Sequence, residues 1–130
     1  MPRPSVSLLS AQASPPAQQG QVVTFTLEGA NPGGEQLPVT TVDYAVFRDD
    51  TLIYRGSRLA ERVLPAAGTE RIILPAPIAL SQDQPPINPG EQWSIAGTIT
   101  YEIPGAFAEL LFDNRIRRPK LRFAATANIQ

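Results

Sequence analysis

The sequence of 130 residues contains no histidine and no cysteine. Histidine is the most frequent general acid–base catalyst near neutral pH and the most frequent ligand of transition metals. Cysteine would be needed for a disulfide framework, a thiolate zinc site or a thiol nucleophile. The two absences together remove the central residue of most hydrolases and metalloenzymes. We therefore expect a protein that is not an enzyme.

The sequence also lacks a surplus of charge and a long apolar run. Its formal net charge is −1, so no overall field favours nucleic acid or a membrane. No apolar stretch approaches the roughly 18 residues that a transmembrane helix needs, and the start of the chain lacks the apolar segment of a signal peptide. A location in the cell envelope or periplasm would require an export signal removed from this sequence, and otherwise we expect the cytoplasm.

Proline, in contrast, is abundant, with 14 of the 130 residues, about twice the usual share of roughly 5%. Between the prolines lie short segments in which apolar and polar residues alternate. Because proline cannot donate to a sheet and alternation is typical of half-buried strands, this spacing excludes long helices and predicts strands. Their inward-facing residues are expected at Val6 and Leu8, at Val23, Phe25 and Leu27, at Val42, Tyr44 and Val46, at Trp93, Ile95, Ile99 and Tyr101, and at Leu121, Phe123 and Ile129.

A pair of aspartates interrupts the third of these runs and predicts a hairpin. Asp49 and Asp50 follow the strand that carries Tyr44, and aspartate tolerates the backbone conformations of tight turns. After the turn, Leu52 and Tyr54 are expected to resume the inward face on the returning strand.

Two further segments are less regular. Residues 72–74 predict a short strand that ends before Pro75, because proline interrupts the ladder. In segment 104–114 the apolar residues have helical spacing, but the segment is short, so both a strand and a single helical turn remain open. The apolar residues concerned are Phe107, Leu110 and Leu111.

Seven or eight short strands, without a long helix or a βαβ pattern, indicate an all-β fold. We predict a Greek-key β-sandwich of immunoglobulin or fibronectin type III-like character, formed by residues 1–130 as a single domain. Trp93 is the expected anchor of its core, in the absence of the disulfide found in antibody domains.

Several motifs in the first hundred residues follow one another in a specific order. A strand ends in an Asn-Pro pair, a Leu-Pro pair follows, then a tyrosine-bearing strand, a hairpin that closes on glycine, and a long strand with a central glycine. Over residues 22–101 this order resembles the WHy (water stress and hypersensitive response) domain of the late embryogenesis abundant (LEA) type 2 family. Where the family has a second asparagine after the Asn-Pro pair, this sequence has Gly33. The motif residues are Asn31, Pro32, Leu37, Pro38, Tyr44, Gly56 and Gly97.

The resemblance implies a soluble, fibronectin-like sandwich with no cofactor, no metal and no catalytic residues. Members of the family are associated with desiccation, cold and other stress, and are thought to protect proteins or membranes. The resemblance therefore implies client proteins or a membrane surface as partners. We expect a monomer that does not bind nucleic acid.

The Asn31-Pro32 pair also has a structural explanation. Proline holds the preceding residue in an extended conformation, which suits the end of a strand. The asparagine amide can bond to the backbone of the following loop. A role in turn formation is therefore favoured over contact with a ligand.

Five of the eleven cationic residues lie between positions 115 and 122. On a strand, alternate residues of this basic stripe would share a face and could contact lipid phosphates. The stripe supports a second hypothesis, an envelope-associated binding or adaptor domain that recognises anionic lipid, an apolar ligand or a protein partner. A solvated face that discourages edge-to-edge association is the simpler interpretation. The candidate contact residues are Arg117, Arg118, Lys120 and Arg122.

Overall fold

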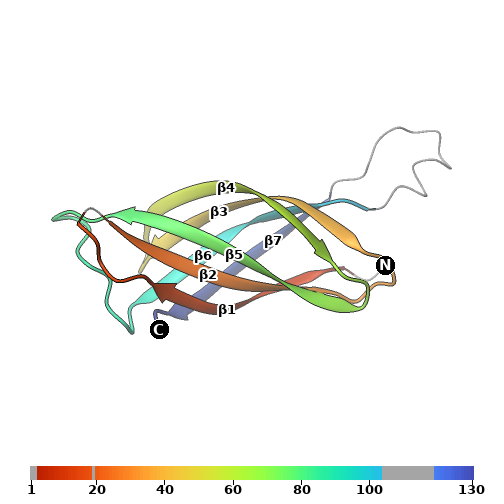
Figure 1. Ribbon diagram of the computed structural model, residues 1–130, viewed down its shortest axis with the longest axis horizontal. Coiled ribbons are helices and arrows are strands. Elements are labelled where there is room, and N and C mark those ends of the chain that lie inside the picture. Colours follow the sequence, from red (N-terminus) through yellow and green to blue (C-terminus); the bar gives the residue numbers. More distant parts are fainter. Residues whose placement is uncertain (1–2, 19, 104–118) are drawn as a thin grey trace.

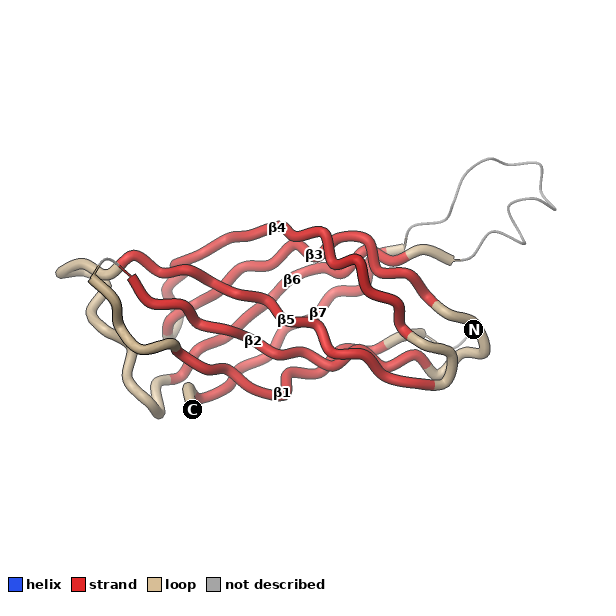
Figure 2. Tube along the Cα trace, in the orientation of Figure 1, coloured by secondary structure: helices blue, strands red, loops and turns tan. Residues whose placement is uncertain are grey.

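The computed structural model describes residues 3–18, 20–103 and 119–130, and within them the chain forms seven β-strands and no helix (Figures 1 and 2). The all-β prediction is therefore confirmed. Segment 104–114 and its apolar residues Phe107, Leu110 and Leu111 lie outside the described residues. The strands are β1 (Ser5–Ala13), β2 (Gly20–Asn31), β3 (Leu37–Arg48), β4 (Thr51–Leu64), β5 (Gly68–Ala79), β6 (Gln92–Tyr101) and β7 (Lys120–Asn128).

The strands form two antiparallel sheets that pack face to face (Figure 2). One sheet has the order β1-β2-β5 and the other the order β4-β3-β6-β7. The β2–β3, β4–β5 and β5–β6 connections each cross from one sheet to the other. This arrangement is the predicted Greek-key β-sandwich.

The inner faces of the two sheets meet in one apolar core. In β2, burial alternates from residue to residue along the whole strand, as expected for a strand with one face on the core. Trp93 and Phe25 are the largest fully buried side chains. Residues predicted to face inward and found buried are Val23, Phe25, Leu27, Val42, Tyr44, Val46, Trp93, Ile95, Ile99, Phe123 and Ile129. Those found partly buried against the same core are Val6, Leu8, Tyr54, Tyr101 and Leu121.

The predicted end of a strand before Pro75 is wrong. Strand β5 continues to Ala79, with Pro75 opposite Thr24 and Pro77 opposite Val22. Since β5 is the outermost strand of its sheet, alternate residues direct their backbone groups away from β2, and a proline there removes no ladder bond. The edge position, which cannot be recognised from the sequence, makes both prolines compatible with the strand.

The β3–β4 hairpin turns at Asp49 and Asp50, as predicted, and Asp49 has a φ of 55°. The expected return of Leu52 to the inner face is wrong, because its side chain is 41% exposed. The strand register shifts beside the turn, where Ile53 is an additional residue of β4. Such an insertion moves the neighbouring side chain to the opposite face. Tyr54, on the other side of the insertion, remains half-buried against the core.

Candidate functional site

Three motif residues lie side by side across the four-stranded sheet. Tyr44 of β3 is paired with Gly56 of β4 on one side and with Gly97 of β6 on the other. The Tyr44 side chain is 4% exposed, and its hydroxyl donates a hydrogen bond of 2.5 Å to the carbonyl of Pro75 on the opposite sheet. This central row therefore connects the two layers of the sandwich through a polar contact.

Packing accounts for the two glycines of the central row. A Cβ atom on Gly56 would lie 2.8 Å from Cε2 of Tyr54 and 3.0 Å from Cζ of Tyr44. A Cβ atom on Gly97 would collide with the carbonyl oxygen of Asp43 and lie 2.9 Å from Cζ of Phe123. The absence of a side chain at both positions lets aromatic rings fill the space.

The environment of Tyr44 keeps its hydroxyl protonated. Burial raises the pKa of Tyr44 to about 12, and the neighbouring Tyr54 acts in the same direction. The two rings are tilted by 41° with their centroids 6.0 Å apart. Tyr44 therefore remains a hydrogen-bond donor throughout the physiological pH range.

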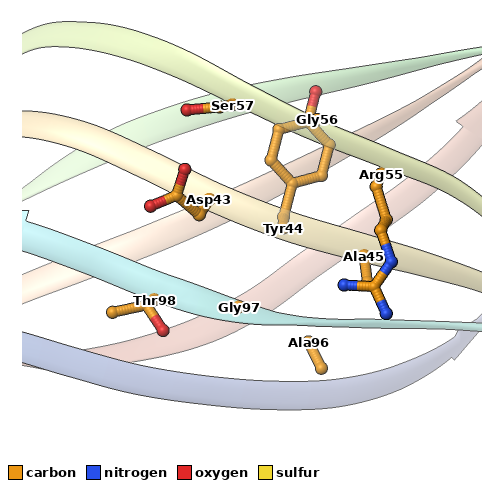
Figure 3. Close-up of a pocket in the computed structure, with 9 residues that line it drawn as sticks. All are labelled: Asp43, Tyr44, Ala45, Arg55, Gly56, Ser57, Ala96, Gly97 and Thr98. Carbon is orange, nitrogen blue, oxygen red and sulfur yellow. The ribbon is translucent and has the colours of Figure 1, made fainter.

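The outer surface of the same sheet has a shallow hollow of about 530 Å³ over β4, β3 and β6 (Figure 3). Asp43 lies opposite Ser57 and Thr98 in the strand register, and Figure 3 shows Arg55 at the other end of the hollow. Ala96, which is in register with Ala45 and Arg55, has a small side chain that adds little height at the Arg55 end. The hollow can offer hydrogen bonds and one guanidinium to a partner, but the chain has no histidine to activate Ser57 as a nucleophile.

Asn31 organises the loop between the two sheets. Its side chain is 3% exposed and accepts a 3.0 Å hydrogen bond from the backbone N–H of Gly33. Its amide donates to the carbonyls of Glu35 at 2.7 Å and Leu64 at 3.3 Å. These bonds hold the end of β2, the loop and the end of β4 together.

The other motif residues lie at the same end of the sandwich. Leu37 and Pro38 begin β3, and the carbonyl of Pro38 accepts a 2.8 Å hydrogen bond from the backbone of Glu102. Pro32 is exposed. The motif residues thus form two groups, one around the Asn31 loop and one in the central row.

The long β5–β6 connection is held by a buttress of Arg48, Glu91 and Trp93, which was not predicted from the sequence. Arg48 and Glu91 form two parallel contacts, Nε to Oε1 at 2.8 Å and Nη2 to Oε2 at 2.9 Å. Arg48 also donates to the carbonyl of Pro85 at 2.7 Å, and its guanidinium carbon lies 5.7 Å from the centre of the Trp93 ring. Bidentate arginine–carboxylate pairs of this kind fix orientation as well as distance.

Glu91 is the acceptor at the centre of the buttress. Its carboxylate also accepts hydrogen bonds from the backbone of Asn88 at 2.6 Å and from the indole of Trp93 at 3.2 Å. Burial disfavours the charged form, but the donors of Arg48, Asn88 and Trp93 outweigh it and lower the pKa of Glu91. No local motif signals this arrangement, because Arg48 and Glu91 are 43 residues apart in the sequence.

The described part of the basic stripe lies on β7, at the edge of the four-stranded sheet. Lys120 and Arg122 are both exposed, and Arg122 is opposite Thr98, which lines the hollow of Figure 3. Arg117 and Arg118 lie outside the described residues.

The described residues contain no group of three or more potential metal-ligating side chains. They also form no helix that is long and apolar enough to span a membrane.

Comparisons with known proteins identify the fold. No protein-family model and no curated protein sequence matches the chain. The solution structure of a candidate late embryogenesis abundant (LEA) protein matches 98% of this chain and 72% of that chain, with a TM-score of 0.64 and 14% sequence identity. A crystal structure of a protein from Archaeoglobus fulgidus matches 95% of this chain and 98% of that chain, with a TM-score of 0.50 and 9% identity. The chain therefore has a fold like that of a candidate LEA protein.

Proposed function

We propose that this chain is a non-enzymatic stress-protective protein of the LEA type 2 kind. In this role it limits the aggregation of other proteins or damage to membranes during water loss or cold. The observation that carries the proposal is the structural likeness to a candidate LEA protein over 98% of the chain. The WHy-like motif residues also support it. One group lies around the Asn31 loop, and the other forms the central row, which connects the two sheets.

The interior of the sandwich is suited to persistence under stress. The Tyr44–Pro75 bond joins the two sheets, and the Arg48–Glu91 pair attaches the longest described connection to the end of β3. Hydrogen bonds shielded from water are electrostatically stronger than bonds in water. A sandwich held together in this way would stay folded while it covers the surfaces of other proteins or of membranes.

The direct test of the proposed function is an enzyme-protection assay. A labile enzyme is dried or frozen with the purified protein, with an equal mass of albumin, or alone, and its activity is measured after recovery. We expect more recovered activity with this protein than with albumin. The variant Gly97→Leu provides an unfolded reference, because its side chain would collide with the Asp43 carbonyl. Protection no better than albumin would refute the proposal, and equal protection by Gly97→Leu would show that the folded sandwich is not the protective form.

A second candidate function is an envelope-associated binding or adaptor domain that recognises anionic lipid, an apolar ligand or a protein. Exposed Lys120 and Arg122 favour it, since neither forms an ion pair among the described residues. Flotation with anionic liposomes at low and high salt tests the lipid form of this function. Mass spectrometry of an organic extract of the purified protein tests for an apolar ligand between the sheets.

A further inference from the structure

Strands β4 and β5 are outer strands of the two sheets and lie side by side along one edge of the sandwich (Figure 1). A cleft of about 200 Å³ opens between them. Buried core residues, among them Val42, Ile72 and Leu74, form its base. The β4–β5 edge thus brings the apolar interior close to solvent.

Large apolar side chains are exposed along this edge. Leu59 of β4 is 73% exposed and Ile73 of β5 is 53% exposed, and both line the cleft. Val63, four residues beyond Leu59 on β4, is 42% exposed. Single apolar side chains are ordinary on protein surfaces, but a group beside a cleft indicates a contact surface.

Two arginines flank the same cleft. Arg58 is paired with buried Val42 and Arg62 with buried Val39, so both occupy core-facing positions of β4. Because β4 is the outermost strand, their side chains emerge into solvent beside the cleft. Neither arginine has a carboxylate within ion-pair distance in the described part of the chain. The edge therefore presents two arginines without ion-pair partners among the described residues next to exposed apolar surface.

The backbone of this edge is unsuited to pairing with a peptide strand. On β4 the register shifts opposite Thr40, and Glu61 has a φ of 43°. On β5, Pro75 and Pro77 lack amide donors. Bulges and prolines disfavour strand addition, so recognition here must use side chains.

We propose that the β4–β5 edge docks on the surface of anionic lipid bilayers. Leu59 and Ile73 enter the interfacial region, and the guanidinium groups of Arg58 and Arg62 contact lipid phosphates. Apolar side chains combined with arginines are the combination that binds an anionic interface, because burial and electrostatic attraction add. The proposal rests on the membrane form of the proposed function and identifies the surface that would carry it.

Vesicle flotation with matched variants tests the site. The full chain is mixed with phosphatidylcholine vesicles, or with vesicles that also contain phosphatidylglycerol, at low and high salt. We expect salt-sensitive binding to the anionic vesicles alone. Each arginine at such a surface contributes about five-fold to the partition coefficient, so Arg58→Gln/Arg62→Gln should weaken binding roughly twenty-five-fold. The variant Lys120→Gln/Arg122→Gln removes equal charge from β7 and should have the smaller effect.

A fluorescent label tests the orientation of the docked protein. Because the chain has no cysteine, the substitution Leu59→Cys gives a unique site for an environment-sensitive dye. Leu9→Cys on β1 is the control, since Leu9 is 44% exposed at the opposite edge of the three-stranded sheet. We expect a blue shift with anionic vesicles for the label at position 59 and none for the label at position 9.

Three results would overturn the docking proposal. These are no binding of the wild-type chain to anionic vesicles, an equal or larger loss for the β7 variant, and equal spectral shifts at positions 59 and 9. Circular dichroism of each variant verifies that it is folded. Enzyme protection in the absence of lipid is a separate measurement, so its outcome distinguishes a failure of the docking surface from a failure of the proposed function.

Discussion

At the scale of single residues, the central row depends on the space around Gly97. Its missing side chain admits the Asp43 carbonyl and the Phe123 ring. We expect Gly97→Ala to destabilise the fold by about 3 kcal/mol or more, because the added methyl group overpacks a core contact that includes backbone. Gly34→Ala is the matched control, since nothing lies within 4 Å of its position, and it should change stability by less than about 0.5 kcal/mol. Urea unfolding followed by Trp93 fluorescence measures both, and similar effects would contradict the packing argument.

The hydroxyl of Tyr44 makes a second prediction at this scale. Removing it in Tyr44→Phe leaves the ring in place but leaves the Pro75 carbonyl without its partner. We expect a loss of about 1–3 kcal/mol at pH 7. Urea unfolding of the two proteins at that pH measures the difference, and a loss near zero would show that water replaces the hydroxyl.

The raised pKa of Tyr44 also has a consequence for alkaline stability. An ordinary tyrosine ionises near pH 10, whereas Tyr44 in the folded chain ionises near pH 12. The unfolded chain therefore loses this proton first, and the stabilisation is complete below pH 10 and is lost as the pH rises toward 12. Unfolding free energies measured between pH 9 and pH 12 should fall more steeply for the wild-type chain than for Tyr44→Phe. The same pH dependence of the unfolding free energy in both proteins would contradict the raised pKa of Tyr44.

At the scale of elements, the buttress around Glu91 fixes the β5–β6 connection. Its carboxyl pKa is lowered in the folded chain, so its stabilisation is present above the ordinary value near 4.5 and is lost as the pH falls through the folded value. Glu91→Gln should cost about 1–3 kcal/mol at pH 7 and weaken the loss of stability in acid. Asp83→Asn, an exposed residue of the same connection, is the control and should leave both properties unchanged. Thermal unfolding from pH 3 to pH 7 measures both the stability at pH 7 and its loss in acid.

The strands themselves were predictable where local pattern and burial agree. Alternation identified the inward faces of β2, β3, β6 and β7, because each of these strands has one face on the core. The rule that proline ends a strand failed at Pro75 and alternation failed at Leu52, since an edge position and a register shift depend on the neighbouring strand. The pairing of Tyr44 with Gly56 and Gly97 could not be derived from spacing, because it depends on how three strands align. The exposure of Arg58 and Arg62 could not be predicted, because the sequence does not show that β4 is an edge strand.

At the scale of the whole molecule, the two sheets share one core and are expected to unfold together. Trp93, the only tryptophan, is fully buried and reports on the packing of that core. Far-UV circular dichroism reports on the strands of both sheets. We expect the two signals to give coincident urea transitions, as for a two-state protein of this size. Separate midpoints would show that the three-stranded and four-stranded sheets are independent units.

The prolines of β5 have a consequence for crowded conditions. During drying, the volume available to each molecule shrinks until neighbouring sandwiches touch along their edges. An outer strand with regular amide donors would then act as a template on which copies polymerise into fibrils. With Pro75 and Pro77 in that strand, a growing stack would miss two donors per molecule along this edge. We therefore expect that β5 edges brought into contact by concentration do not form a continuous hydrogen-bonded ladder.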